Sequence, residues 1–204
     1  MHKVKGVILL PLDSPSYRRH VAHHTFVARV NAAETTPDYR ATLTQAIESR
    51  VREELNRVLT PTRHRVLRWE ETGPTNRSIV RYRELDGVYK TPSGATVLLE
   101  VKASASKGSL SSGIRQLRAA VRAVSLAQPL TSGLLVIADL GAFLDDFGEA
   151  AAVPVADYFV GTPLEVLGWP PEALEPMAQG LFVAVIPQEV ATRWLSEAGT
   201  LDNM

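Results

Sequence analysis

The 204-residue sequence contains no cysteine, few aromatic residues and no net charge. The lack of cysteine excludes a disulfide framework and any zinc site built on thiolates, and it fits a reducing compartment. No apolar run approaches the roughly 20 residues that span a bilayer, so we expect no membrane partner and a cytoplasmic location. Hydrophobic residues make up 45% of the chain and charged residues 22%, which excludes a disordered chain and predicts a sizeable core.

The zero net charge conceals two oppositely charged parts. Residues 1–126 contain 21 of the 22 Lys and Arg residues but only 11 of the 22 acidic residues. Residues 127–204 contain the other 11 acidic residues and a single basic residue, Arg193. A basic part of this size suits a polyanion such as nucleic acid. The acidic part either offsets it within the fold or pairs with another molecule, which predicts a homodimer contact or a protein partner.

The hydrophobic pattern predicts an α/β fold. Helical spacing of apolar residues extends over about 42–59, from about 113 to 127, and over 188–198. Alternating or continuous apolar runs predict strands over 4–10, 25–31, 65–70, 78–90, 95–103, 134–138 and 182–186. These elements divide the chain into an N-terminal β extension (1–39), a core (40–140) and an acidic C-terminal α/β extension packed on the core (141–204).

The turn at residues 92–94 sets the register of one hairpin. Pro-Ser-Gly at these positions suits a three-residue loop, with Pro starting a type I turn and Gly in the left-handed region. With this loop, Thr91 faces Ala95, and Asp86 lies directly opposite Glu100. A loop of two or four residues would instead put Asp86 opposite Val101 or Leu99.

Alternation along the second strand of this hairpin places Leu98, Glu100 and Lys102 on one face. Two opposed carboxylates, about 5 Å apart at Cβ, repel each other unless a cation lies between them. A hard divalent cation, most simply Mg²⁺, prefers such oxygen ligands. The alternative is that Glu100 and Lys102 form an ordinary exposed pair on an edge strand.

Asp86, thirteen intervening residues and then Glu100-Val101-Lys102 resemble the PD-(D/E)xK nuclease superfamily, the restriction-endonuclease-like fold. The resemblance covers about half of the chain, and Leu85 stands where the motif has its proline. It implies a core of helix, three-strand meander, helix and strand around a mixed sheet. It also implies a Mg²⁺-dependent phosphodiesterase, with Mn²⁺ as a substitute, in which Asp86 and Glu100 bind the metal and Lys102 is catalytic. We expect an endonuclease acting on DNA, with RNA left open.

Members of this superfamily often add an acid from the helix that precedes the core strands. Glu48 and Glu54 both lie within the apolar arc of residues 43–59, and helical geometry places Glu54 more centrally. Glu48 precedes Val51 and Leu55 by three and seven residues, which resembles the Holliday-junction-resolvase branch, and this resemblance favours Glu48 as a further metal ligand. Either acid is otherwise a solvated side chain at the border of the helix face.

Basic residues around the motif are candidates for binding the nucleic-acid backbone, although a solvated cationic face is the ordinary alternative. The set comprises Arg83, Lys107, Arg115, Gln116, Arg118 and Arg122, where Gln116 follows Lys102 by fourteen residues as in exonuclease-like members. The rival function is a non-catalytic module on a nuclease-like fold that binds nucleic acid or a partner protein.

Overall fold

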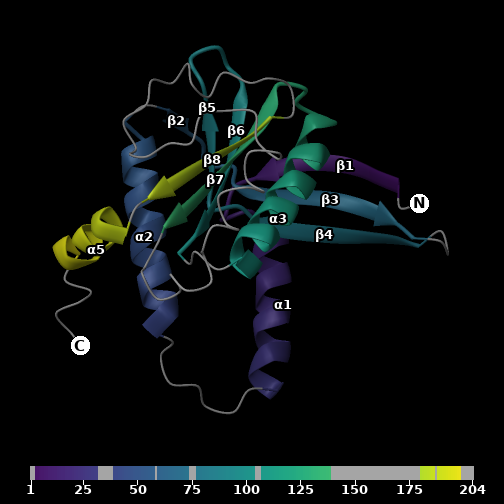
Figure 1. The fold of residues 1–204 in the computed structure, drawn as a ribbon. Coiled ribbons are helices and arrows are strands. Elements are labelled where there is room, and N and C mark those ends of the chain that lie inside the picture. The colour runs from purple at the N-terminus through teal and green to yellow at the C-terminus, as the bar shows by residue number, and fades with distance from the viewer. Residues whose placement is uncertain are drawn as a thin grey trace.

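The computed structural model describes residues 3–31, 39–57, 59–73, 77–103, 107–138, 180–186 and 188–198. These residues form a mixed α/β structure with a three-stranded and a five-stranded sheet, as the sequence predicts at the level of fold class (Figure 1). No helix in these ranges is long and apolar enough to cross a membrane.

The smaller sheet is antiparallel, with the order β1-β3-β4. Its strands are β1 (Lys3–Leu10), β3 (Val66–Thr72) and β4 (Ser78–Glu84). The register of β1 against β3 shifts between Lys5 and Ile8, where Gly6 has a φ of 61°. This irregularity is a β-bulge at a glycine in the left-handed region, and a bulge of this kind bends its strand.

The helix α1 (Pro15–Asn31) replaces the strand that the alternating pattern predicts over 25–31. That prediction is wrong, and residues 1–39 are not purely a β extension. The cause lies in the sequence just before the helix: the Ser14 hydroxyl accepts a hydrogen bond from the Tyr17 N–H at 3.4 Å, and Pro15 occupies the first helical position. A Ser-Pro pair is a helix start as readily as a turn.

The larger sheet, called the central sheet below, has the order β2-β5-β6-β7-β8. Its strands are β2 (Thr60–Pro61), β5 (Gly87–Lys90), β6 (Thr96–Lys102), β7 (Thr131–Ala138) and β8 (Leu181–Ile186). The β5–β6 pair is antiparallel, whereas β6–β7 and β7–β8 are parallel, so the sheet is mixed as expected.

The expected three-strand meander is divided between the two sheets. The predicted strand over 78–90 breaks at Leu85 and Asp86, so β4 pairs in the small sheet and β5 in the central sheet. The buried Leu85 still bonds toward β3, because its N–H donates to the Arg65 carbonyl at 2.8 Å. Gly87 already pairs with Leu99 of β6.

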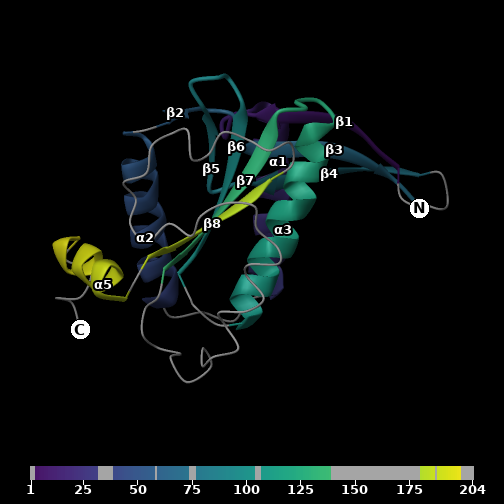
Figure 2. The same cartoon turned by 45° about the horizontal axis from the view of Figure 1, so that its top comes forward.

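Helices cover both faces of the central sheet (Figure 2). α2 (Tyr39–Leu55) and α5 (Gln188–Glu197) share one hydrophobic cluster with Leu99 and Val101 of β6. α3 (Lys107–Ser125) shares the other with Leu98 and with residues of the small sheet, so it lies between the two sheets. β8 pairs with β7, and α5 packs against α2; both belong to residues 141–204, most of which lie outside the described residues.

Candidate functional site

The turn between β5 and β6 has the predicted geometry. The Thr91 N–H donates to the Ala95 carbonyl at 3.0 Å, the Gly94 N–H donates to the Thr91 carbonyl at 2.9 Å, and Gly94 has a φ of 85°. The ladder then runs from Lys90↔Thr96 to Gly87↔Leu99. One further step in the same register puts Asp86 opposite Glu100, as the sequence predicts.

The two faces of β6 are also those expected from alternation. Leu98 packs in the cluster under α3, whereas Leu99 and Val101 pack in the cluster under α2. Glu100 and Lys102 therefore share the α3 side. The alternative of an exposed pair on an edge strand is wrong, since β6 has neighbours on both sides and Glu100 is only 5% exposed.

The buried Glu100 carboxylate is held by two cations. Its Oε2 accepts from the Arg83 guanidinium at 2.7 Å, and its Oε1 accepts from the Lys102 ammonium at 2.6 Å. The other arm of Arg83 donates to the backbone carbonyl of Gln116 in α3 at 2.6 Å. Both oxygens of Glu100 thus have charged partners, which is how a protein tolerates a carboxylate this deep.

Asp86 lies immediately before the first residue of β5. Its Oδ2 accepts the Val101 N–H at 2.6 Å, so the side chain provides an acceptor that the backbone of β5 no longer supplies. The pKa of Asp86 is raised from 3.8 to about 6, mainly by burial. The nearby charges of Glu100 and Glu48 contribute to the rise, against the lowering effect of the Val101 N–H and Lys102. Three carboxylates therefore interact electrostatically at this place.

Glu48 reaches this cluster from α2. Arg52, one turn later, donates to the Glu48 carboxylate at 3.5 Å and to the Asp86 carbonyl at 3.4 Å. Glu54 instead pairs with Arg50 and Arg57 on another part of the helix. Of the two acids that the sequence offers, the structure brings Glu48 to Asp86.

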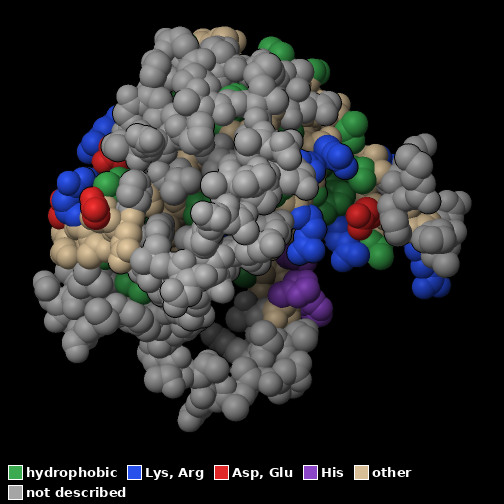
Figure 3. All heavy atoms as spheres, in the orientation of Figure 1, with side chains coloured by type: hydrophobic (Ala, Val, Ile, Leu, Met, Phe, Trp, Pro, Cys, Tyr) green, Lys and Arg blue, Asp and Glu red, His purple; other side chains and the backbone are tan. Residues whose placement is uncertain are grey.

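The residues predicted to bind nucleic acid divide into two groups. Arg83 pairs with the buried Glu100, and it holds the backbone carbonyl of Gln116 with its other arm. Arg115 and Arg122 are exposed on α3 and Arg118 is half-buried there, and Figure 3 shows Lys and Arg side chains gathered on this side of the molecule. The Lys107 backbone begins α3, and its side chain lies outside the described residues.

The side chains around Asp86 are of the types that bind a divalent cation, but they are not arranged as a ready coordination shell. Glu48, Asp86 and Glu100 supply carboxylate oxygens, and Gln116 adds a buried Oε1 with no hydrogen-bond partner among the described residues. Within the same residues, no three potential ligands come close enough together to hold an ion. Both oxygens of Glu100 already accept a charged hydrogen bond, so a cation that binds here either shares these oxygens with Arg83 and Lys102 or displaces one of the two.

Two supporting features are not evident from the motif. Arg65 joins Arg52 at the Asp86 carbonyl, also at 3.4 Å. Gly113 lets α3 approach the sheet, since a Cβ there would lie 2.8 Å from Leu135 Cδ1 and 3.3 Å from Lys102 Cγ. Of the contacts around Asp86, only the Glu48–Arg52 pair is indicated by the sequence, through its four-residue spacing on a helix.

The chain matches no family model, no curated protein and no solved structure. Its function therefore has to be argued from the chemistry of the site.

Proposed function

We propose that this protein is a Mg²⁺-dependent nuclease, an endonuclease that hydrolyses DNA phosphodiester bonds on a restriction-endonuclease-like core. The observation that carries the proposal is the register of the β5–β6 hairpin, which sets Asp86 opposite Glu100 with Lys102 on the same face. The electrostatic coupling of Asp86 to Glu100 and Glu48 supports a shared cation as the reason for gathering these acids.

Asp86, Glu100 and Glu48 would hold the ion, with Mn²⁺ as a substitute. Bound there, Mg²⁺ supplies positive charge at the scissile phosphate and a more acidic water. Lys102 lies 2.6 Å from Glu100, so its ammonium is positioned to stabilise negative charge that builds on a phosphate oxygen. Asp86 keeps its carboxylate oriented through the Val101 N–H. Arg83 keeps Glu100 oriented and leaves Lys102 available to the substrate.

The order of elements around the site supports the expected core. α2 carries Glu48, the β5–β6 hairpin carries the motif, and α3 leads to β7, which is parallel to β6. The division of the meander between two sheets departs from the simplest form of that core.

Exposed cations on α3 are suited to the DNA backbone. Arg115 and Arg122 lie on the helix that covers the Glu100 face, and Arg122 and Arg83 also line a hollow of about 450 Å³ between α3 and the small sheet. Contacts of this kind give affinity that falls with salt and carry no sequence preference by themselves.

Cleavage assays test the proposal directly. Supercoiled, linear, single-stranded and branched DNA, together with RNA, are incubated with Mg²⁺, Mn²⁺ or EDTA. We expect Mg²⁺-dependent nicking of the supercoiled plasmid. Asp86→Asn, Glu100→Gln and Lys102→Ala are expected to lower the rate by about 100-fold or more, since each removes a group that acts on the reacting phosphate.

Matched controls separate the site from general charge. Glu53→Gln changes an exposed acid of α2, and Lys5→Ala changes an exposed lysine of β1. Both variants are expected to keep full activity, while circular dichroism shows that every variant is folded. Full activity in all three site variants would overturn the assignment.

A non-catalytic module is the second candidate, and one observation favours it: Glu100 already has a cation on each oxygen without any metal. Such a module would bind DNA, or a partner through its acidic C-terminal part, and cleave nothing. Melting with and without Mg²⁺ discriminates, because binding at the site raises the melting temperature by mass action. No shift, together with DNA binding in EDTA, would favour the module.

A further inference from the structure

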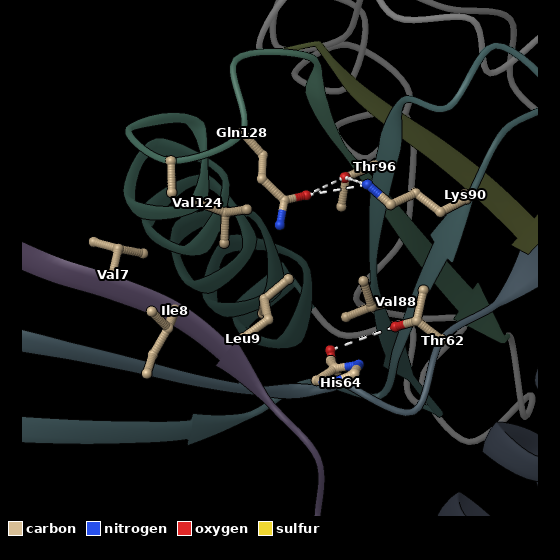
Figure 4. A pocket seen from close by; sticks show the side chains of 11 residues that line it. Val7, Ile8, Leu9, Thr62, His64, Val88, Lys90, Thr96, Val124 and Gln128 are labelled. Atoms are coloured by element: carbon tan, nitrogen blue, oxygen red, sulfur yellow. Dashed lines mark hydrogen bonds between the residues drawn. The ribbon is translucent and has the colours of Figure 1, made fainter.

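A second polar cluster lies at the other end of the β5–β6 hairpin, in a pocket between the two sheets. The pocket has a volume of about 390 Å³, which is in the range of small-molecule sites. Figure 4 shows it between β1, the last turns of α3 and β5. Its walls are mainly aliphatic and include Val7, Ile8, Leu9, Val88, Val124 and Ala127.

The strand β1 forms one wall of the pocket. In a regular strand, successive side chains point to opposite faces. After the register shift at Gly6, Val7 and Leu9 lie on the pocket side of β1 in Figure 4, and both pack against the cluster under α3. Ile8 lies at the rim on the other side of the strand and is 46% exposed.

Lys90 provides the only lysine or arginine among the lining residues, and no lining residue is acidic. Its ammonium donates to Thr96 Oγ1 at 2.6 Å and to Gln128 Oε1 at 3.2 Å, with the Gly94 carbonyl at 3.5 Å. Each of these acceptors is neutral, and Lys90 has no ion pair among the described residues. Within the described ranges, the charge of this ammonium is therefore solvated by dipoles and has no counter-ion.

The orientation of Gln128 adds a second donor. Its Oε1 is turned toward Lys90 and Thr96, and in Figure 4 its amide nitrogen points the opposite way, into the pocket. An ammonium and an amide N–H at one end of an aliphatic cavity match the head of a monoanion. The aliphatic walls match an apolar body.

We propose that this pocket binds a small amphipathic carboxylate. The carboxylate pairs with Lys90 and accepts from the Gln128 amide, and its hydrocarbon part lies against Val7, Leu9 and Val124. A single cationic side chain favours a monoanion over a nucleotide or a free phosphate, which carry more charge and need more donors. The pocket shares no residue with the acid cluster, so the inference does not rest on the nuclease assignment.

Titration of the full chain with four probes tests the class of ligand. Octanoate, 1-octanol, octylamine and inorganic phosphate are followed by calorimetry and by amide chemical shifts of Thr96 and Gln128. We expect saturable binding of octanoate, at least tenfold weaker binding of the alcohol and amine, and none of phosphate. Equal binding of octanoate and octanol, phosphate binding as tight as octanoate, or no binding of octanoate would overturn the proposal.

Variants locate the binding. Lys90→Met removes the charge and keeps the chain length, and Ala127→Trp narrows the exposed mouth while leaving the Lys90 contacts intact. Each is expected to weaken octanoate binding at least tenfold, whereas Lys5→Met, at an exposed lysine outside the pocket, leaves it unchanged. Melting curves verify folding. Unchanged affinity in both pocket variants would place the ligand elsewhere and overturn the inference.

Discussion

Each end of the β5–β6 hairpin carries charged or polar side chains, but the charges around them differ between the two ends. At one end Asp86, one step beyond the last pair of the ladder, is coupled to Glu100, and at the other end Lys90 pairs with Thr96. Glu100 is 5% exposed and has two cationic partners. Lys90 is half-buried, and the acceptors that it has in the described part of the chain are all neutral.

This difference shows what each end requires of its neighbours. A carboxylate taken out of water depends on its cations, so removing one leaves an uncompensated buried charge. A lysine that still reaches solvent needs only dipoles, and losing one partner costs little. The first end is therefore where substitutions have large effects on stability, and the second is where a ligand can change the charge balance without unfolding the chain.

The largest expected effect is that of Arg83→Met. The substitution leaves Glu100 with one cation in a nearly dry position, and we expect a loss of about 2–4 kcal/mol in the free energy of unfolding, measured by urea denaturation. The double variant Arg83→Met/Glu100→Gln is expected to recover most of that loss, because the uncompensated charge is gone. A loss below about 0.5 kcal/mol in the single variant would mean that water reaches Glu100.

The next effect concerns Asp86, whose pKa is raised from 3.8 to about 6. Because the folded state disfavours the ionised carboxylate, the chain loses stability as the pH rises from about 4 through 6. Asp86→Asn keeps an acceptor for the Val101 N–H and removes the charge. Without metal it is expected to be more stable than the wild type by on the order of 2 kcal/mol at pH 8, with little difference at pH 3.5.

Mg²⁺ is expected to affect the stability of the wild type and of Asp86→Asn differently. A divalent ion at the acid cluster offsets the repulsion that raises the pKa of Asp86, so it is expected to raise the melting temperature of the wild type at pH 8 and leave that of Asp86→Asn unchanged. Equal shifts in the two proteins would mean that the ion binds elsewhere.

A smaller effect is expected at the turn that fixes both ends. Gly94 has a φ of 85° with open space around its Cα, so Gly94→Ala introduces backbone strain and no clash. We expect a loss of about 1 kcal/mol with the hairpin register retained. A register change, seen as altered cross-strand NOEs at both ends, would contradict this expectation.

The register of the hairpin and the faces of its side chains were predictable because they depend on local rules. The Pro92-Ser93-Gly94 turn determines the register, and alternation determines the face of Glu100 and Lys102. The choice of Glu48 over Glu54 followed from the family resemblance, since helical geometry alone placed Glu54 more centrally. The structure brings Glu48 within electrostatic reach of Asp86. Whether these residues bind metal and cleave DNA stays a prediction.

The rest depends on contacts between distant segments. Residues 25–31 alternate like a strand, and the helix start at Ser14 and Pro15 lies ten residues earlier. The strand breaks at Leu85 because the N–H of Leu85 donates to the Arg65 carbonyl next to β3 and not to the central sheet. No local sequence pattern indicates this bond. Arg83 was predicted to face nucleic acid, and its contact with Glu100 comes from the way α3 lies between the two sheets.

The smallest effect, that of Lys90→Met, tests the comparison most directly, since it is the counterpart of Arg83→Met at the other end of the hairpin. After the substitution Thr96 Oγ1 and Gln128 Oε1 still bond each other, at 2.5 Å, so no buried acceptor is left without a donor. We therefore expect a loss below about 1 kcal/mol in urea denaturation. A loss as large as that of Arg83→Met would show that Lys90 is as dependent on its partners as Glu100 is, and the two ends would no longer differ in kind.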